Sequence, residues 1–292
     1  MAQKTIITHD GKFHADDVCA VATLLLCEKE AKVVRTRDRE KIASADFVVD
    51  VGEVYDTKRN RFDHHQREGA GTRENGISYA AFGLVWNRFG EKIAGGREAA
   101  EHIDRWLAQP LDAHDNGVAL FSTTSLGVYP YELADAMCAL VPSWREDQGE
   151  MDKRFHEAVS FAQKLLLREI EQAQAQIEGA RKVEASFHQT EDKRIIVLDE
   201  DIPWKEVLAR TPEPLFVVHP QDGQWLVECV RDNPAVFVNR KDLPEQWRGL
   251  RDEELAEITG VSDAVFCHRN RFMAVAKTKE SALALAEKAL LS

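Results

Sequence analysis

The chain has 292 residues, of which 44% are hydrophobic and 30% are charged, and its formal net charge is −12. This length allows two domains with a sizeable core, and the sequence contains no apolar run long enough to cross a membrane. The acidic balance argues against a long electropositive groove for duplex DNA, because neutralisation of phosphates dominates that kind of binding. A short or single-stranded anionic substrate stays compatible if bound divalent metals supply the positive charge locally.

The N-terminus and the cysteines predict a cytoplasmic protein. The strand-like stretch KTIIT follows the first residues without a signal-peptide or presequence pattern. The five cysteines are odd in number, lack CxxC spacing and lie among apolar neighbours, so we expect reduced, mostly buried thiols.

The first third of the chain alternates strand and helix signals. The predicted elements are a strand over 4–8, a helix over 16–29, a strand near Val33, a helix over 38–43 and a strand ending at Asp50. This β-α-β-α-β pattern predicts a mainly parallel sheet flanked by helices. Ligand chemistry in such sheets gathers beyond the carboxyl ends of the strands. His9 and Asp50 are expected there.

The rest of the chain predicts helices first and a second domain afterwards. Helices are expected over 78–89, over 96–108 and over 131–140, and Pro110 is expected to stop the second of them. A long helix is expected from Met151, because apolar residues recur there at steps of three and four. Short β runs follow at RIIVLD, LFVVH, WLVECV, AVFCH and FMAVAK, with helices over 204–209, 252–258 and 279–291. We therefore expect an α/β protein with a catalytic domain over 1–148, a connector helix over 149–182 and a smaller α+β, substrate-binding domain over 183–292.

The stretch THDGKFHADD gathers histidines and carboxylates ahead of the first helix. Asp16 or Asp17 is a good N-cap, which accounts for one carboxylate. Capping does not account for His9 and His14, and two imidazoles with a spare carboxylate at the mouth of a parallel sheet are metal ligands by nature. On this cluster alone, metal binding and plain structural roles stay equally open.

Two later stretches, FDHHQR and PLDAHDNG, add the same residue types. Adjacent histidines point different ways, so His64 can bind a metal while His65 reaches a substrate phosphate, and Asp63 can hold an imidazole in its binding tautomer. A solvated polar loop is the alternative for DHH, and for DNG alone a simple turn is the better interpretation.

Taken together, these stretches supply three imidazoles and three carboxylates: His9, His14, Asp16, Asp50, His64 and Asp115. Such a mixed nitrogen and oxygen set suits manganese best, with magnesium, cobalt or zinc as alternatives. Six ligands are too many for one ion with open positions. A pair of ions sharing a carboxylate, roughly 3.5 to 4 Å apart, is the economical solution and serves phosphoryl chemistry.

The order of the motifs HDGKFHADDVCAVA, VVDVGEVYD, FDHHQ and DAHDNG resembles the DHH phosphoesterase superfamily. Together with PWKE at Pro203 and LPEQWRGLRDEELAEITGV from Leu243, these motifs are similar to those of the Myg-one exonuclease family, whose older label was metal-dependent protein hydrolase. The similarity runs over nearly the whole chain. Protein hydrolysis is not expected, because no HExxH-like or nucleophile motif is present.

The resemblance implies a role for each position of the predicted site. His14 and Asp16 take the places of two spaced Asp residues, and His9 stands one residue further away than usual. Asp50 would bridge both ions, His64 and Asp115 would be ligands, His65 would face the substrate, and Asp17 would cap the helix.

In the C-terminal domain, the resemblance implies a Gly-rich substrate segment with a histidine, but this chain has CHRNRFMAVAKT from Cys267 to Thr278. His268 is kept and the small residues are replaced. Arg269 and Arg271 are interpreted as phosphate clamps, with a charged hairpin turn as the alternative, and Arg67 is a further expected substrate contact.

The function implied is a metal-dependent phosphodiesterase, a 3'-to-5' exonuclease acting on RNA or short oligonucleotides, with His65 and Asp50 as its catalytic residues. Hydrolysis of small phosphoesters or phosphoanhydrides, as by pyrophosphatases, is the second hypothesis. A non-catalytic, metal-binding regulatory protein is the third. A homodimer is left open.

Overall fold

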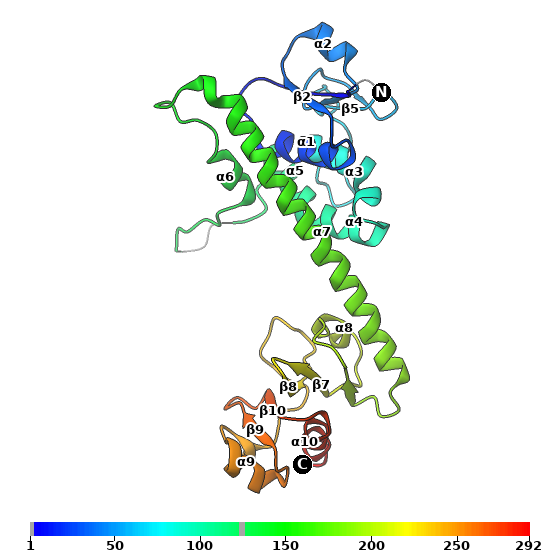
Figure 1. Cartoon of the computed structure of the whole chain (residues 1–292), viewed down its shortest axis with the longest axis vertical. Helices are drawn as coiled ribbons and strands as arrows, with labels where there is room; N and C mark the ends of the chain where they lie inside the picture. Colours follow the sequence, from blue (N-terminus) through cyan, green and yellow to red (C-terminus); the bar gives the residue numbers. More distant parts are fainter. Residues whose placement is uncertain (1–2, 123–125) are drawn as a thin grey trace. The chain divides into compact units, whose positions relative to one another are not determined.

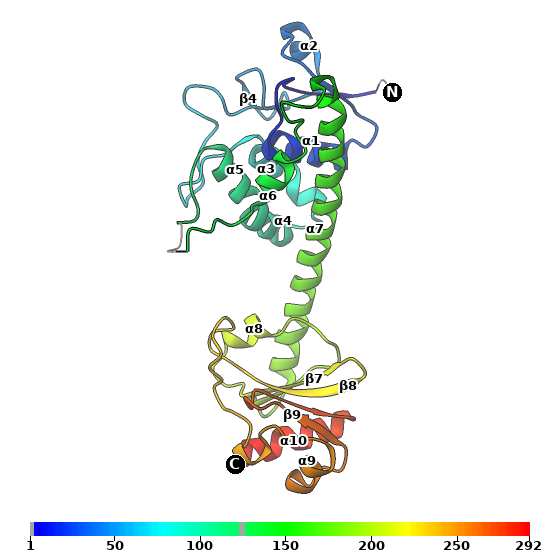
Figure 2. The same cartoon turned by 90° about the vertical axis from the view of Figure 1, so that its left-hand side faces the viewer.

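The computed structural model describes residues 3–122 and 126–292, which form two compact units that divide between Gln174 and Ala175 (Figures 1 and 2). Each unit is built on a mixed sheet of five strands with helices packed on it. The predicted α/β class is confirmed. Across the described ranges, no helix is both long and apolar enough to span a membrane, and all five cysteines are free thiols.

The N-terminal sheet has the strand order β2-β1-β3-β5-β4. Neighbouring strands run parallel except β4, which pairs antiparallel with β5. The sheet is therefore mainly parallel, as predicted. Its strands are β1 (Thr5–Thr8), β2 (Lys32–Arg35), β3 (Phe47–Val49), β4 (Tyr55–Asp56) and β5 (Arg61–Phe62).

Helices cover both faces of this sheet (Figure 1). On one face, Ile42 of α2 (Arg39–Ser44) packs against Ile7 and Val48. On the other, α1 (Ala15–Cys27) packs against β1, β3 and the helix α3 (Ala81–Ile93). The first half of α1 is buried around its whole circumference, which anchors its N-terminus beside the carboxyl ends of the strands.

The expectation that Pro110 stops a helix is wrong. Helix α4 (Arg97–Ile103) continues through a π-helical turn, η1 (Asp104–Ala108), into α5 (Gln109–Asp115). Pro110 lies in the first turn of α5, where a missing backbone N–H costs little. The stretch PLDAHD is therefore helical, and the turn begins only at Asn116.

Helix α7 (Met151–Gln189) is the long helix predicted from its apolar spacing. It follows α6 (Leu133–Cys138) and the short η2 (Gln148–Glu150). Its side chains with the predicted spacing are buried up to Ala173, and Ile177 is half-buried. The division between the two units falls within this helix.

The C-terminal unit has the strand order β6-β7-β8-β10-β9, with one parallel pair, β6 and β7, and antiparallel pairs elsewhere. Helix α10 packs on β7, β8 and β10. Its elements are β6 (Ile195–Val197), α8 (Lys205–Ala209), β7 (Phe216–Gln221), β8 (Gln224–Cys229), η3 (Glu245–Trp247), α9 (Asp252–Thr259), β9 (Ala264–Cys267), β10 (Met273–Ala276) and α10 (Lys279–Leu291). The predicted α+β fold of this unit is confirmed.

Candidate metal centre

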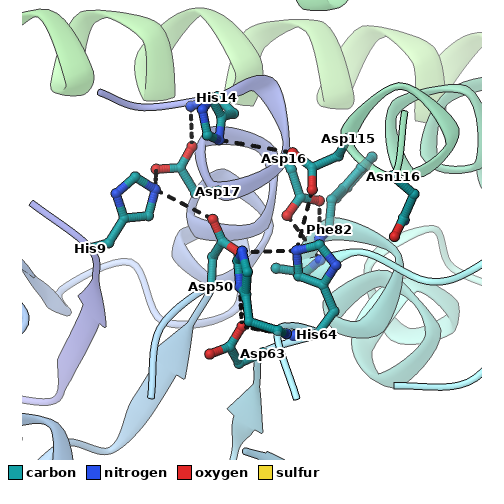
Figure 3. A network of polar contacts seen from close by, with 12 residues as sticks. His9, His14, Asp16, Asp17, Asp50, Asp63, His64, Phe82, Asp115 and Asn116 are labelled. Carbon is teal, nitrogen blue, oxygen red and sulfur yellow. Dashed lines mark hydrogen bonds and ion pairs between the residues drawn. The ribbon is translucent and has the colours of Figure 1, made fainter. Parts of the chain in front are cut away.

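Three parallel, adjacent strands end in polar residues at one edge of the N-terminal sheet. His9 follows β1, Asp50 follows β3, and the Asp63–His65 stretch follows β5. Because the carboxyl ends of parallel strands meet at the same edge, these side chains converge (Figure 3). Asp50 has φ 54, a left-handed conformation that Asp tolerates better than most residues.

Asp50 lies at the middle of this group and is 4% exposed. Its Oδ2 is 3.3 Å from Nε2 of His9, and its Oδ1 is 3.3 Å from Nε2 of His64. The same carboxylate therefore faces two imidazoles that come from different strands, the position expected of a shared ligand.

Asp16 and Asp115 complete the group from two helices. Asp16 is buried in the first turn of α1 and accepts hydrogen bonds from the backbone N–H groups of Ala81 and Phe82, at 2.9 and 2.7 Å, where α3 begins. Asp115 is the last residue of α5, and its Oδ2 is 3.2 Å from Nε2 of His64. A carboxylate at the negative end of a helix dipole is unfavourable unless a cation lies nearby.

His14 and Asp17 lie at the start of α1. His14 is the N-cap residue, and its backbone N–H donates to Asp17 at 2.8 Å. Asp17 therefore caps the helix from inside its first turn, and neither Asp16 nor Asp17 is the N-cap residue. The other oxygen of Asp17 lies 3.2 Å from Nε2 of His9, so this buried carboxylate also contacts a predicted ligand.

Asp63 is buried and holds the loop that carries both adjacent histidines. Its Oδ1 accepts from the backbone N–H of His64 at 2.8 Å and lies 2.7 Å from Nδ1 of His65. The His65 side chain is 58% exposed, whereas that of His64 is 9% exposed. The two imidazoles therefore differ in exposure, although Nδ1 of His65 also lies 3.5 Å from Oδ1 of Asp50.

The donor set fits divalent cations. Three overlapping groups have ligand atoms within 4.8 Å of one another: His9 with His14 and Asp50, Asp50 with His64 and His65, and Asp16 with His64 and Asp115. Ligands at right angles around an ion at about 2.1 Å lie roughly 3 Å apart, close to the contacts seen here. Buried atoms of this cluster lack a hydrogen-bond partner among the described residues, namely Asp17 Oδ2, Asp50 Oδ1 and His64 Nε2.

The pKa values show the electrostatic cost of the cluster. Burial raises the pKa of Asp16, and the carboxylates of Asp50 and Asp115 raise it further. Burial by itself would lower the pKa of His9, but the close carboxylates of Asp17 and Asp50 raise it to about 9. Burial would raise the pKa of Asp50, yet the imidazoles of His64 and His9 hold it well below its ordinary value. The imidazoles therefore act as the cations that these carboxylates need.

The remaining predicted site residues lie outside this cluster. Arg67 is exposed in the loop after the histidines. His268, Arg269 and Arg271 belong to the C-terminal unit, in the turn between β9 and β10. Arg271 forms ion pairs with Asp242 at 3.0 Å and Glu245 at 3.1 Å, so its charge is already matched by the segment at η3, whereas Arg269 is exposed.

A buried ion pair that was not predicted from the sequence lies one helical turn before Asp115. Asp112, one turn earlier in α5, is fully buried, accepts from the backbone N–H of Gly83 at 3.0 Å and pairs with Arg73 at 2.7 Å. Arg73 also pairs with Asp104 and lies over the ring of Tyr79. The three-residue spacing of Asp112 and Asp115 would have been the signal, had the segment been recognised as helical.

Comparisons with known proteins found similarity over nearly the whole chain. A family model named MYG1_exonuc, described as "Uncharacterised protein family (UPF0160)", matches residues 5–290. The chain is 32% identical to MYG1 exonuclease of Homo sapiens, over 99% of this chain and 86% of that protein. It is 33% identical to MYG1 exonuclease of Bos taurus, over 99% and 85%, and 32% identical to MYG1 protein of Chlamydia trachomatis, over 95% and 93%.

Proposed function

Because the chain belongs to the MYG1 exonuclease family, we propose that it is a divalent-metal-dependent phosphodiesterase that removes nucleotides from the 3' end of RNA or short oligonucleotides in the cytoplasm. The printed names of the relatives support exonuclease activity. The observation that carries the proposal for this chain is Asp50, a buried carboxylate between two imidazoles from neighbouring strands.

The proposed site holds two ions, with manganese as the preferred metal. One would be held by His9, His14 and Asp50, and the other by Asp16, Asp50, His64 and Asp115. Two of the three groups of close donor atoms support this division. When bound, such ions activate water and stabilise charge on phosphoryl oxygens.

His65 is the proposed substrate-facing residue of this site. Asp63 fixes one ring nitrogen of His65, so the ring is oriented before substrate arrives, and its exposure leaves the other nitrogen open to a phosphoryl oxygen. Arg67 and the C-terminal His268 and Arg269 are further proposed contacts for the strand. Arg271 is a weaker candidate because two carboxylates hold it.

A comparison of substrates under manganese tests the proposal. We expect removal of single nucleotides from a 5'-labelled single-stranded RNA, at a rate well above that of pyrophosphate hydrolysis, and loss of activity after chelation. The product ladder on a denaturing gel reports the direction of cleavage. Preferential pyrophosphate hydrolysis would instead identify a small-molecule phosphohydrolase, and metal binding without turnover of either substrate would identify a regulatory protein.

Metal binding is expected to release protons near neutral pH. The pKa of His9 is raised to about 9, and an imidazole must be neutral to bind a metal. Manganese affinity should therefore rise with pH, by about tenfold per unit for one displaced proton, up to about pH 9. Calorimetry in two buffers of different ionisation enthalpy counts the protons.

The variant His9→Gln should release fewer protons than the unmodified protein, whereas His156→Gln, an exposed histidine on α7, should release the same number. Metal binding releases a proton and does not take one up, because the raised pKa keeps His9 protonated in the metal-free protein below about pH 9. Manganese affinity that does not change between pH 6.5 and 9 would contradict His9 as a ligand.

A further inference from the structure

The C-terminal unit carries a row of neighbouring planar groups, formed by Phe237, Arg231, Phe272 and His268. The guanidinium of Arg231 lies 4.3 Å from the ring centre of Phe237 and 5.7 Å from that of Phe272. The ring centres of Phe272 and His268 are 4.4 Å apart, with the rings tilted by 49°. The row thus joins the segment after β8 to the β9–β10 turn, and it places the Arg231 cation between two aromatic rings.

The outer end of the row faces solvent. Phe237 is 82% exposed, and its neighbours Val236 and Val238 are 46% and 68% exposed. An aromatic side chain this exposed contributes little to the core, and the Arg231 guanidinium lies against it. Arg231 is itself oriented, because its Nε donates to Asn239 at 3.2 Å.

The charge of the row is not neutralised within the unit. Within the described ranges, no carboxylate lies at ion-pair distance from Arg231, and the adjacent Asp232 is paired with Arg240 at 2.6 Å. By contrast, Arg271 in the β9–β10 turn is held by two carboxylates. Arg231 is therefore a positioned cation without a direct ion-pair partner among the described residues.

A small hollow lies beside the row. It is lined by Trp204, Lys205 and Glu228 together with Arg231 and Phe272, and it encloses about 20 Å³. That volume admits about one water molecule, so a planar ligand would lie across the mouth and not inside. The Lys205 side chain is 60% exposed at this rim and pairs with Glu228 at 3.4 Å, so Arg231 is the cation of the hollow without an ion-pair partner among the described residues.

We propose that this row is a base-stacking platform for single-stranded nucleic acid, in which one base stacks on Phe237 and a flanking phosphate contacts Arg231. Aromatic faces interleaved with cations are the means by which proteins grip single strands without reading their sequence. A duplex would not fit this chemistry, since its bases are already stacked on one another. The proposal rests on the proposed nuclease function and names the surface of the C-terminal unit that holds the strand.

Binding of a labelled single-stranded RNA of about eight nucleotides, measured by fluorescence anisotropy with chelator present, tests the platform. Phe237→Ala should weaken binding by about 5- to 100-fold, the range for loss of one stacked base. Arg231→Gln should weaken binding and lower its salt dependence. The matched controls are Ile258→Ala, another exposed apolar residue of this unit, and Arg248→Gln, an exposed arginine paired with Glu245; both should bind as the unmodified protein does.

Unchanged affinity in both row variants would overturn the platform. Loss of self-association on sedimentation, with oligonucleotide affinity unchanged, would also overturn it and identify a contact between copies of the chain. With manganese present, the row variants should raise KM for RNA and leave kcat unchanged. Failure of the nuclease function is a separate result, because the unmodified protein would then bind RNA without cleaving it.

Discussion

Asp50→Asn is expected to abolish tight manganese binding and to lower RNA hydrolysis by about 10³-fold or more, since one charged ligand shared by both proposed ions is lost. Asn is the sharper choice than Ala, because the residue has φ 54 and Asn tolerates this left-handed conformation. The side chain keeps its size, so the fold is retained while the charge between His9 and His64 is removed. Metal content by mass spectrometry and initial rates measure the two effects.

The control is Asp10→Asn, which neutralises an exposed carboxylate next to His9 that pairs only loosely with Arg37 at 3.4 Å. This variant should keep both manganese ions and its rate within about twofold. A folded Asp50→Asn protein that retains its manganese and its activity would contradict the proposed centre. Equal losses in both variants would show that net charge near the site, and not ligation by Asp50, sets the activity.

The parts of the candidate site that follow strands were predictable from the sequence. A parallel sheet places the carboxyl ends of its strands at one edge, so residues far apart in the chain, such as His9, Asp50 and His64, had to converge if the strand assignment was correct. In the structure, Nε2 of His9 and Nε2 of His64 each lie 3.3 Å from a carboxylate oxygen of Asp50. Their metal-binding roles are proposals.

The site residues that come from helices were less predictable, because signals that break or cap a helix compete there with signals that continue it. Pro110 is a helix breaker on its own, but the π-helical turn before it lets the chain continue into α5, and so Asp115 lies at a helix end and not in a loop. The sequence pattern predicts that Asp17 only caps the helix, yet its second oxygen contacts His9. The row in the C-terminal unit depends on side-chain contacts between segments, which carry no periodicity.

Arg73→Met is expected to destabilise the N-terminal unit by up to about 3 kcal/mol at pH 9, because it leaves the buried charge of Asp112 without a partner. Burial raises the pKa of Asp112 to about 7 even with Arg73 beside it. Without Arg73 the pKa must rise further, so the folded variant favours protonated Asp112. Below about pH 7 Asp112 is protonated in both folded proteins, so the loss of stability should be small there and should grow by up to about 1.4 kcal/mol per pH unit above about pH 7.

Urea unfolding of the full chain at pH 5 and pH 9 measures this effect. Adding Asp112→Asn to Arg73→Met should recover much of the loss at pH 9, since Asn removes the charge and its carbonyl oxygen still accepts from the backbone N–H of Gly83. Arg97→Met, which breaks an exposed pair with Glu101, is the matched control and should change stability by less than about 1 kcal/mol. A pH-independent loss in Arg73→Met would place its role in packing against Tyr79 instead. Asp112 also joins α5 to α3 through the backbone N–H of Gly83. The double variant therefore separates the charge of Asp112 from its support of Asp115: if manganese affinity recovers together with stability, the scaffold alone positions that proposed ligand.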